Sequence, residues 1–209
     1  MIPFRDTSDE TLARTTFADF YALKPRQDTT RILPYIEQNR ILDKIVPHGP
    51  RTVMCGFNYQ NLSIQLLNYT LEAFKVYITT LGNDYVQSII LFEGYHTEKV
   101  CQIPLDAMAC ATRHPCFRTA MAMRWKGAQH DTWVRRWVKN FMDGAVSIDQ
   151  MTVTEKRGPE TSGYANFVLP ETKNSAIFAE NLKRLEEIKA KWDSAGRFNK
   201  LFNVSGKKQ

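Results

Sequence analysis

The sequence predicts an α+β fold: a largely antiparallel sheet with helices packed on one face, preceded by an N-terminal helical arm. Two extended segments rich in β-branched and aromatic residues follow one another without a helix between them, which indicates antiparallel pairing. Each of three predicted helices has its apolar residues along one side, and packing all three on one sheet face buries them together. The other sheet face is then left for a ligand, a partner or the arm.

The helical arm is expected over residues 1–50, as two helices. Ser8 is a suitable N-cap for the first helix because its hydroxyl can accept a hydrogen bond from the first turn, which also contains two acidic residues. Pro25 ends this helix, and the second spans about residues 34–46. The α+β domain is expected over residues 51–204.

The domain begins with a predicted strand over residues 51–59, followed by the clearest helix in the chain. Apolar residues recur in this helix at spacings of three and four, at Ile64, Leu67, Leu71, Phe74, Ile78 and Leu81. Gly82 is expected to end it. Residues 85–96 are predicted to form the next strand, because β-branched and aromatic side chains dominate them.

Residues 116–127 alternate between two kinds of side chain, which is typical of a strand with two different faces. One face has Phe117, Thr119, Met121, Met123 and Trp125, and the other has Arg118, Ala120, Ala122 and Arg124. A helix is predicted over about residues 132–142, and Gly144 is expected to end it. The stretch 144–163 is ambiguous and fits a short strand followed by a long polar loop.

The C-terminal part is predicted as a strand over residues 164–169 and a helix that starts near Asn174. The apolar residues of this helix form one stripe, Phe178, Leu182, Leu185, Ile188 and Trp192. The stripe predicts a helix that packs across the sheet, with Phe198 folded back onto the core. Residues 205–209 are expected to be a disordered tail.

Charge and hydropathy argue against two classes of partner. The net charge is +6, with seven basic residues between Arg113 and Lys139, but no aromatic motif of a nucleic-acid-binding module accompanies them. No apolar run reaches the roughly 18 residues of a membrane span, and the N-terminal residues lack the features of a signal peptide. We therefore expect a cytoplasmic protein that binds neither nucleic acid nor membrane.

The four cysteines are expected to be reduced, because the sequence has no export signal. A metal site would have to join Cys110, His114 and Cys116. These three residues lack the paired spacing of zinc ligands, so no metal is expected.

The stretches YANF and FAENLKRLEEIKAKWDSAGRF resemble the C-terminal signature of the berberine-bridge-enzyme-like flavoproteins. The matching positions are Tyr164, Asn166, Asn181, Arg184, Leu185, Lys189, Asp193 and Phe198. The chain departs from the family pattern where Phe178-Ala179 replaces Tyr-Gly and where Ser194 replaces the proline after the aspartate. The order and the residue pattern of the predicted elements extend the resemblance over roughly residues 50–204.

The resemblance implies a substrate domain of the vanillyl-alcohol oxidase superfamily. That family binds FAD mainly in a separate N-terminal domain, with a glycine-rich pyrophosphate loop and often a covalent His or Cys link to the flavin. This sequence has neither, so we expect no cofactor unless a partner chain supplies an FAD-binding domain. Asn166 matches a family position near the flavin.

The candidate site residues lie on the predicted strands and on the link before the third of them. The proposed catalytic residues are Glu93, Arg124 and Tyr164, and the proposed substrate-binding residues are Tyr95, Arg118, Asn166 and His114. Glu93 and Tyr95 share one face of their strand, because side chains alternate along a strand. An arginine beside a glutamate can hold an anionic intermediate while the glutamate moves a proton.

Three functions remain open from the sequence. The first is a flavin-independent enzyme, of secondary metabolism, that carries out a cyclisation, isomerisation, elimination or pericyclic step on a hydrophobic small molecule. The second is a split or truncated FAD-linked oxidase subunit that needs an FAD-binding chain. The third is a non-catalytic binding or scaffold protein, with a homodimer as one form of association. The mixed polar and apolar strand faces favour the first function.

Overall fold

The structure is a computed structural model that describes residues 8–38, 40, 41, 43, 49–153, 164–200 and 202–204. The chain divides into two compact units, Met1–Pro47 and His48–Gln209. The predicted tail at residues 205–209 and most of the predicted loop at 154–163 lie outside the described residues.

The described residues of the first unit form three short helices, α1 (Glu10–Thr16), α2 (Ala18–Ala22) and α3 (Tyr35–Gln38). The N-cap of α1 is Asp9, whose carboxylate accepts a hydrogen bond from Leu12 N at 3.0 Å. The prediction of Ser8 was therefore wrong by one residue, because the aspartate oxygen reaches the third amide of the helix. The predicted helix at 34–46 is helical over α3, and part of its remainder lies outside the described residues.

The second unit is built on four antiparallel strands, β1 (Arg51–Cys55), β2 (Asn58–Tyr59), β3 (Tyr85–Glu93) and β4 (Phe117–Trp125). Strand β4 is central: β3 pairs along its length, and β1 and β2 pair with its later and earlier residues. The largely antiparallel sheet predicted from the sequence is confirmed. The first predicted strand, 51–59, is in fact β1 and β2 with a break between them.

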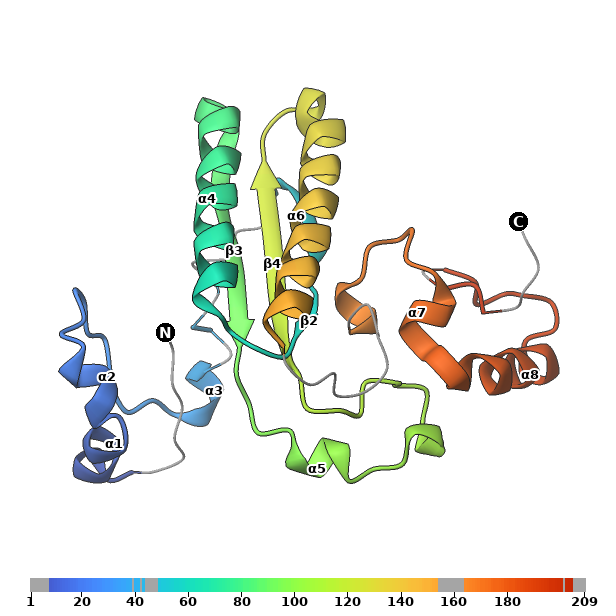
Figure 1. Ribbon diagram of the computed structural model, residues 1–209, viewed down its shortest axis with the longest axis horizontal. Coiled ribbons are helices and arrows are strands. Elements are labelled where there is room, and N and C mark those ends of the chain that lie inside the picture. The colour runs from blue at the N-terminus through green and yellow to red at the C-terminus, as the bar shows by residue number, and fades with distance from the viewer. Residues whose placement is uncertain are drawn as a thin grey trace. The chain divides into compact units, whose positions relative to one another are not determined.

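Two long helices, α4 (Ile64–Leu81) and α6 (Asp131–Thr152), lie side by side on one face of this sheet (Figure 1). Both helices pack against the face of β4 that the alternation in the sequence predicted to be apolar. Met121, Met123 and Trp125 belong to the buried core together with residues of both helices. Ser63 caps α4 by accepting from Leu66 N, and Gly82, with a φ of +50°, ends it as predicted.

Helix α6 continues for two more turns beyond the predicted end at Gly144. Its buried side recurs at helical spacing, at Val134, Val138, Phe141, Ala145 and Asp149, so the helix keeps packing after the glycine. The carboxylate of Asp149 then accepts hydrogen bonds from Gln60 N and Asn61 N at 2.9–3.0 Å, which fastens the end of β2 to the helix.

Short elements connect these parts. They are η1 (Gly82–Asp84) before β3, α5 (Glu98–Cys101) and η2 (Leu105–Ala107) in the link between β3 and β4, and η3 (Ala128–His130) before α6. The link between β3 and β4 agrees with the prediction of a loop with short helical pieces. It extends beyond the end of the sheet from which β4 starts (Figure 1).

The C-terminal segment contains η4 (Ala165–Phe167), α7 (Asn174–Phe178), η5 (Ala179–Asn181) and α8 (Leu182–Trp192). The predicted strand at 164–169 is wrong. Its chain turns because Phe167 N donates to Tyr164 O at 2.7 Å, and its bond to the sheet region is Gly56 N to Phe167 O at 2.6 Å. The helix predicted from Asn174 does start there, but it breaks at Ala179, which has a φ of +44°.

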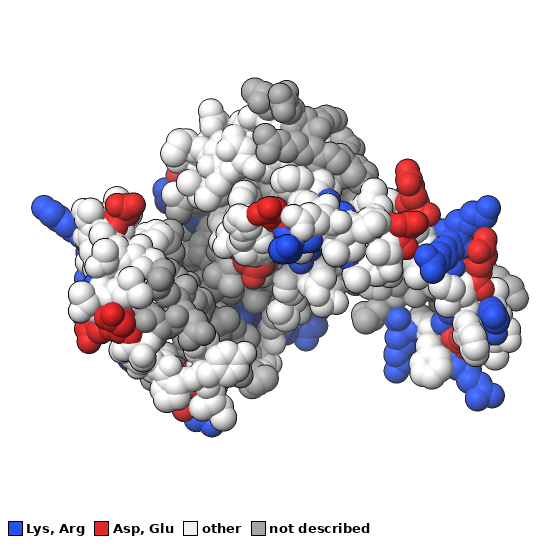
Figure 2. Space-filling model, turned by 90° about the horizontal axis from the view of Figure 1, so that it is seen from below, with Lys and Arg blue, Asp and Glu red and all other residues white. Residues whose placement is uncertain are grey.

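Helix α8 does not pack across the sheet, so that prediction is also wrong. Asn181, just before α8, donates to Leu105 O and Met108 O, which attaches the segment to the link between β3 and β4. The predicted stripe is partly in solvent: Ile188 is 45% and Trp192 77% exposed, and Phe198 is 82% exposed instead of folded onto the core. Charges of both signs surround this segment (Figure 2).

Candidate functional site

Arg118 lies at the centre of a group of polar and aromatic residues on the second face of the sheet, opposite α4 and α6. The strand register places Glu93 of β3 and Asn58 of β2 directly beside it on the two neighbouring strands. Residues opposite each other in an antiparallel pair point to the same face. The three side chains therefore form a row across the sheet, and we call them with their neighbours Tyr95, Tyr164 and Asn166 the Arg118 cluster.

Two tyrosine rings hold the Arg118 guanidinium. Its Cζ atom lies 4.5 Å from the ring centroid of Tyr164 and 5.9 Å from that of Tyr95, and both distances are in the range of cation–π contacts. Asn166 Nδ2 donates to the Tyr164 hydroxyl oxygen at 2.9 Å. The two ring contacts position the Arg118 guanidinium without hydrogen bonds from its N–H groups.

Among the described residues, no ion pair joins Arg118 to Glu93, although the two lie opposite each other. Among the described residues, Arg118 makes no ion pair, and its Nε is buried without a hydrogen-bond partner. The Glu93 backbone oxygen accepts from the Tyr59 hydroxyl at 3.3 Å, but its carboxylate has no ion pair in the described part of the chain. A positive and a negative side chain therefore stand side by side, both available to a ligand.

Burial and the charge of Arg118 shift the pKa values of two nearby groups, the Tyr95 hydroxyl and the Cys116 thiol. Burial raises the pKa of Tyr95, and the positive charge of Arg118 opposes that rise. Burial also raises the pKa of the Cys116 thiol, to about 11, again against the effect of Arg118. Both groups are therefore protonated near neutral pH, and neither supplies a base.

The structure brings five of the seven predicted site residues together, Glu93, Tyr95, Arg118, Tyr164 and Asn166. Tyr164 and Asn166 lie together and share a hydrogen bond, although the strand predicted for them is not formed. Asn58 was missed, although it lies in the strand predicted at residues 51–59, because the sequence does not show which residue of a neighbouring strand it faces.

Arg124 is not part of this cluster. It lies six residues along β4 from Arg118, is 1% exposed, and donates through Nη1 to Gln87 O at 2.7 Å. Its backbone N also donates to the Ser88 hydroxyl at 2.8 Å. These contacts hold β3 at its irregularity between Val86 and Ile89, so the structure gives Arg124 a structural role.

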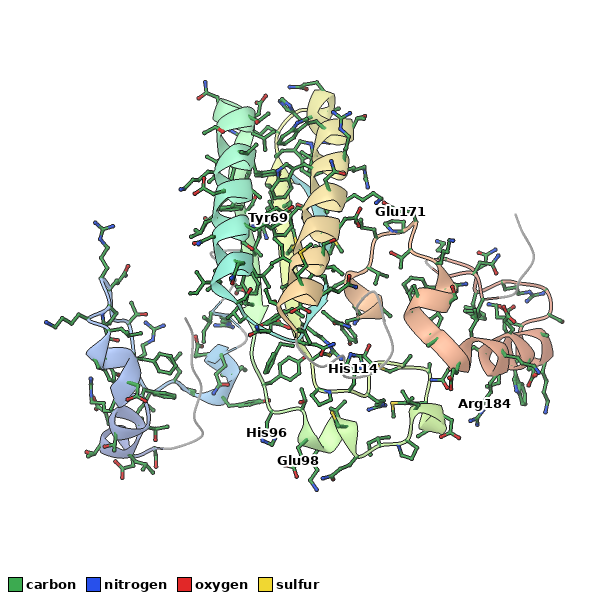
Figure 3. All side chains as sticks on the ribbon, viewed as in Figure 1. Tyr69, His96, Glu98, His114, Glu171 and Arg184 are labelled. Carbon is green, nitrogen blue, oxygen red and sulfur yellow. The ribbon has the colours of Figure 1, made fainter. Side chains whose placement is uncertain are left out.

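His114 lies in the link that leads into β4 (Figure 3). Burial lowers its pKa, and its Nδ1 is buried with no hydrogen-bond partner among the described residues. The neutral ring is thus the favoured form at neutral pH, and it would have to bind a ligand as a donor or acceptor rather than as a cation.

Residues 163–204 match the family described as "Berberine and berberine like". This C-terminal segment is berberine-like. The resemblance stated for Tyr164, Asn166 and the helix after them is confirmed for it. Two residues of the Arg118 cluster, Tyr164 and Asn166, therefore come from the berberine-like segment.

Two solved structures share the fold of the chain. Physcomitrella patens BBE-like 1 has a TM-score of 0.68 and 15% identity, over 97% of this chain and 44% of its own. Aclacinomycin oxidoreductase has a TM-score of 0.63 and 17% identity, over 91% of this chain and 40% of its own. The chain thus spans less than half the length of these structures. No curated protein matched the sequence.

The berberine-like flavoproteins bind FAD, and the N-termini of the two long helices do not fit its diphosphate. Such a site uses free backbone N–H groups where a glycine-rich turn opens a helix. In α4, however, the Ser63 hydroxyl already accepts a hydrogen bond from a backbone N–H of the first turn. Helix α6 begins with the negatively charged Asp131, whose carboxylate pairs with Arg51. The described residues also contain no group of three His, Cys, Asp or Glu that could hold a metal ion.

No helix in the described ranges is long and apolar enough to cross a membrane. The longest helix, α6, has buried residues on one side and charged residues on the other, as expected of a helix that covers a sheet.

Proposed function

We propose that this chain is the substrate-binding part of a berberine-like FAD-linked oxidoreductase, in which polypeptide outside the described residues binds FAD. The observation that carries the proposal is the Arg118 cluster, which joins residues of the berberine-like segment to polar residues of the sheet. The shared fold with an oxidoreductase supports it.

Exposed apolar side chains also support an incomplete assembly. Trp192 and Phe198 are 77% and 82% exposed, and Met54 is 55% exposed on the second face of the sheet beside Ala122. A chain that completes its site by contact with an FAD-binding part would cover such side chains.

In this function, the residues of the cluster have separate roles. The rings of Tyr95 and Tyr164 offer apolar surface to a planar hydrophobic substrate. The Arg118 guanidinium would bind a carbonyl or developing oxyanion through its N–H groups, and Glu93 would accept a proton from the substrate. Asn58 and Asn166 would orient the substrate by hydrogen bonds.

The same cluster favours a second candidate, the flavin-independent enzyme. A base and a cation placed side by side are sufficient for an isomerisation, elimination or cyclisation that starts with removal of a proton. Such a reaction needs no redox centre, and the free pair of Glu93 and Arg118 supports it as well. The two candidates differ in what the native protein contains.

The test is to isolate the native protein with an antibody against α6 and to measure its mass and absorption spectrum. We expect either a single chain well above 24.1 kDa or a complex with a second chain, in each case with a flavin spectrum. A colourless native protein of 24.1 kDa that is active on a carbonyl substrate would contradict the proposal and support the flavin-independent enzyme.

In the active native form, Glu93→Gln should lower kcat by about 100-fold or more, since a positioned base contributes roughly 10²–10⁴-fold. The free energy of unfolding should stay within about 0.5 kcal/mol of the original, because the variant keeps the shape of the side chain. Glu72→Gln is the matched control, because Glu72 lies on the exposed side of α4. Unchanged kcat in Glu93→Gln would remove Glu93 from the mechanism.

A further inference from the structure

A cavity lies between α4 and α6, on the helical side of the sheet and so away from the Arg118 cluster. Its volume is about 180 Å³, and four aromatic residues line it, Tyr69, Trp133, Trp137 and Phe141. The proposed function makes no use of it. Any ligand that it binds would therefore be additional to the substrate on the second face.

Three of the rings around the cavity, those of Tyr69, Trp137 and Phe141, are nearly parallel. Phe141 stacks on Trp137 at 5.3 Å with 1° between the ring planes, and on Tyr69 at 5.5 Å with 6°. Phe141 is buried and forms the floor, while Trp137 and Tyr69 are half-buried. A flat ring that enters between the helices would meet other rings in stacked or edge-to-face arrangements, which are the preferred aromatic contacts.

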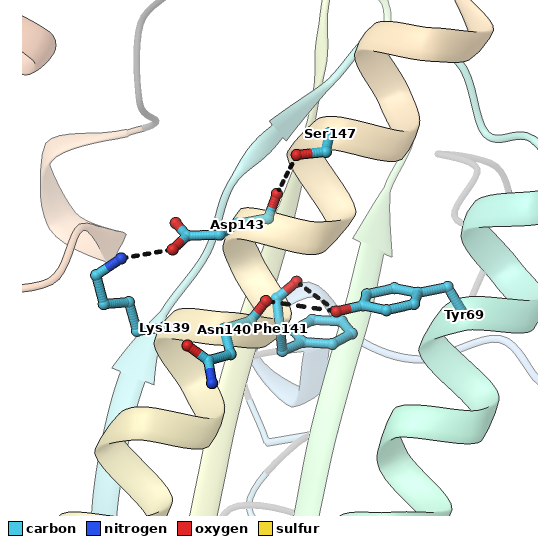
Figure 4. A network of polar contacts seen from close by, with 6 residues as sticks. All are labelled: Tyr69, Lys139, Asn140, Phe141, Asp143 and Ser147. Carbon is cyan, nitrogen blue, oxygen red and sulfur yellow. Dashed lines mark hydrogen bonds and ion pairs between the residues drawn. The ribbon is translucent and has the colours of Figure 1, made fainter.

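One wall of the cavity is held in place by the fold. The Tyr69 hydroxyl lies 3.4 Å from the carbonyl oxygens of Asn140 and Phe141 and reaches α6 from α4 (Figure 4). It can do so because Gly144 has no side chain, and a Cβ there would overlap the hydroxyl. The tyrosine ring is therefore fixed before any ligand binds, which lowers the entropic cost of binding.

The rim of the cavity has one charged side chain, and it is positive. Arg136 lines the cavity and makes no ion pair among the described residues, while its neighbour Lys139 pairs with Asp143 at 2.5 Å (Figure 4). Asn140 adds an amide to the same rim. A ligand with a negative group at one end of a flat ring would match both the rim and the interior.

The volume is sufficient for one ring, because a cavity of about 150 Å³ in another protein binds benzene. From the size, the parallel rings and the charge at the rim, we propose that this cavity is a second binding site, for a single-ring aromatic carboxylate. The ring lies against Phe141 and the carboxylate accepts hydrogen bonds from Arg136.

The test is a titration of the full chain with benzoate, followed by tryptophan fluorescence. Trp133 and Trp137 line the cavity, whereas Trp125 is buried in the core. A Trp192→Phe background removes the signal of the exposed tryptophan on α8. We expect a saturable change in fluorescence with benzoate, a weaker one with benzamide, and none with cyclohexanecarboxylate.

Two variants separate the parts of the proposal. Ala73→Phe fills the cavity and should abolish the response to benzoate, with folding checked by circular dichroism. Arg136→Gln should weaken benzoate binding about two- to fivefold and leave benzamide unchanged, as expected for an exposed ion pair. Arg135→Gln is the matched control, because Arg135 is exposed on α6 and does not line the cavity.

Several results would overturn the proposal. These are the absence of a saturable response to benzoate, an equal response in a folded Ala73→Phe variant, and equal binding of cyclohexanecarboxylate. Equal affinity for benzamide and benzoate would overturn the choice of a carboxylate. None of these results depends on FAD, so the test can fail while the proposed function stands, and the reverse also holds.

Discussion

A single residue, Gly144, shows that a glycine in a helical pattern can either end the helix or allow a close contact inside it. A glycine often ends a helix, and this was the expectation for α6. In the structure it lies inside the helix and makes room for the Tyr69 hydroxyl. The sequence around Gly144 does not contain this information, because Tyr69 is on a different helix.

The sign of the stability change in Gly144→Ala distinguishes the two roles. We expect a loss of about 1–3 kcal/mol in the free energy of unfolding, measured with urea, because the new Cβ would overlap Tyr69. If the glycine only weakened the helix, alanine would stabilise it by about 1 kcal/mol. Gly94→Ala is the control, because a Cβ at Gly94 has open space around it.

The four cysteines differ in burial, and this predicts their reactivity. Burial raises the pKa of Cys55 to about 12 and that of Cys116 to about 11, so both are thiols, not thiolates, near neutral pH. Cys101 and Cys110 are only half-buried. We expect iodoacetamide to modify Cys101 and Cys110 first, with Cys55 and Cys116 protected until denaturant is added. Peptide mass spectrometry checks the order, and early modification of Cys55 would contradict the buried position.

At the scale of elements, the end of α8 depends on one carboxylate. Asp193 pairs with Lys189 and also accepts hydrogen bonds from Phe198 N at 3.0 Å and Arg197 N at 2.7 Å. The hydrogen bond from Lys189 and then those from these amides lower the pKa of Asp193 to about 2, from an ordinary value of 3.8. Gly196, with a φ of +63°, completes the turn after the helix.

This lowered pKa predicts how the turn responds to acid. A carboxyl group with a lower pKa in the folded state stabilises it fully above the unfolded value of 3.8, and the stabilisation is lost as pH falls through 2. The amide resonances of Arg197 and Phe198, followed by NMR, should therefore shift with a midpoint near 2. Asp193→Asn should remove this titration, and a midpoint near 3.8 would mean that the pairing is absent.

At the scale of the whole molecule, the exposed part of the C-terminal stripe indicates a surface that the second unit does not cover itself. Apolar side chains recur on one side of α8, yet none of its residues is buried. The prediction that this stripe lies across the sheet failed because the segment instead attaches to the link between β3 and β4.

Trp192→Ser tests whether this surface contacts an FAD-binding part. The free energy of unfolding of the chain alone should change by less than about 0.5 kcal/mol, because Trp192 is 77% exposed. In the native flavin-containing form, the variant should retain less FAD after dialysis, measured by absorbance. Leu71→Ser is the control, because Leu71 is also exposed but lies on α4. Equal loss of FAD in both variants, or no loss in either, would contradict the contact.

The sequence by itself determined the elements whose periodicity is strong and local. The spacing from Ile64 to Leu81 defines α4, the alternation from Phe117 to Trp125 defines both faces of β4, and the berberine-like segment is recognisable from Tyr164 onward. These signals lie within one segment of chain, where side-chain periodicity follows directly from backbone geometry.

Only the tertiary structure decided which residues meet. It separated Arg124 from Arg118, although both lie on one face of β4, and it placed Asn58 beside Arg118 through the register of β2 with β4. It also extended α6 through Gly144 and left Trp192 exposed. The physical reason is the same in each case: these outcomes depend on contacts between segments far apart in sequence, and local periodicity carries no information about them.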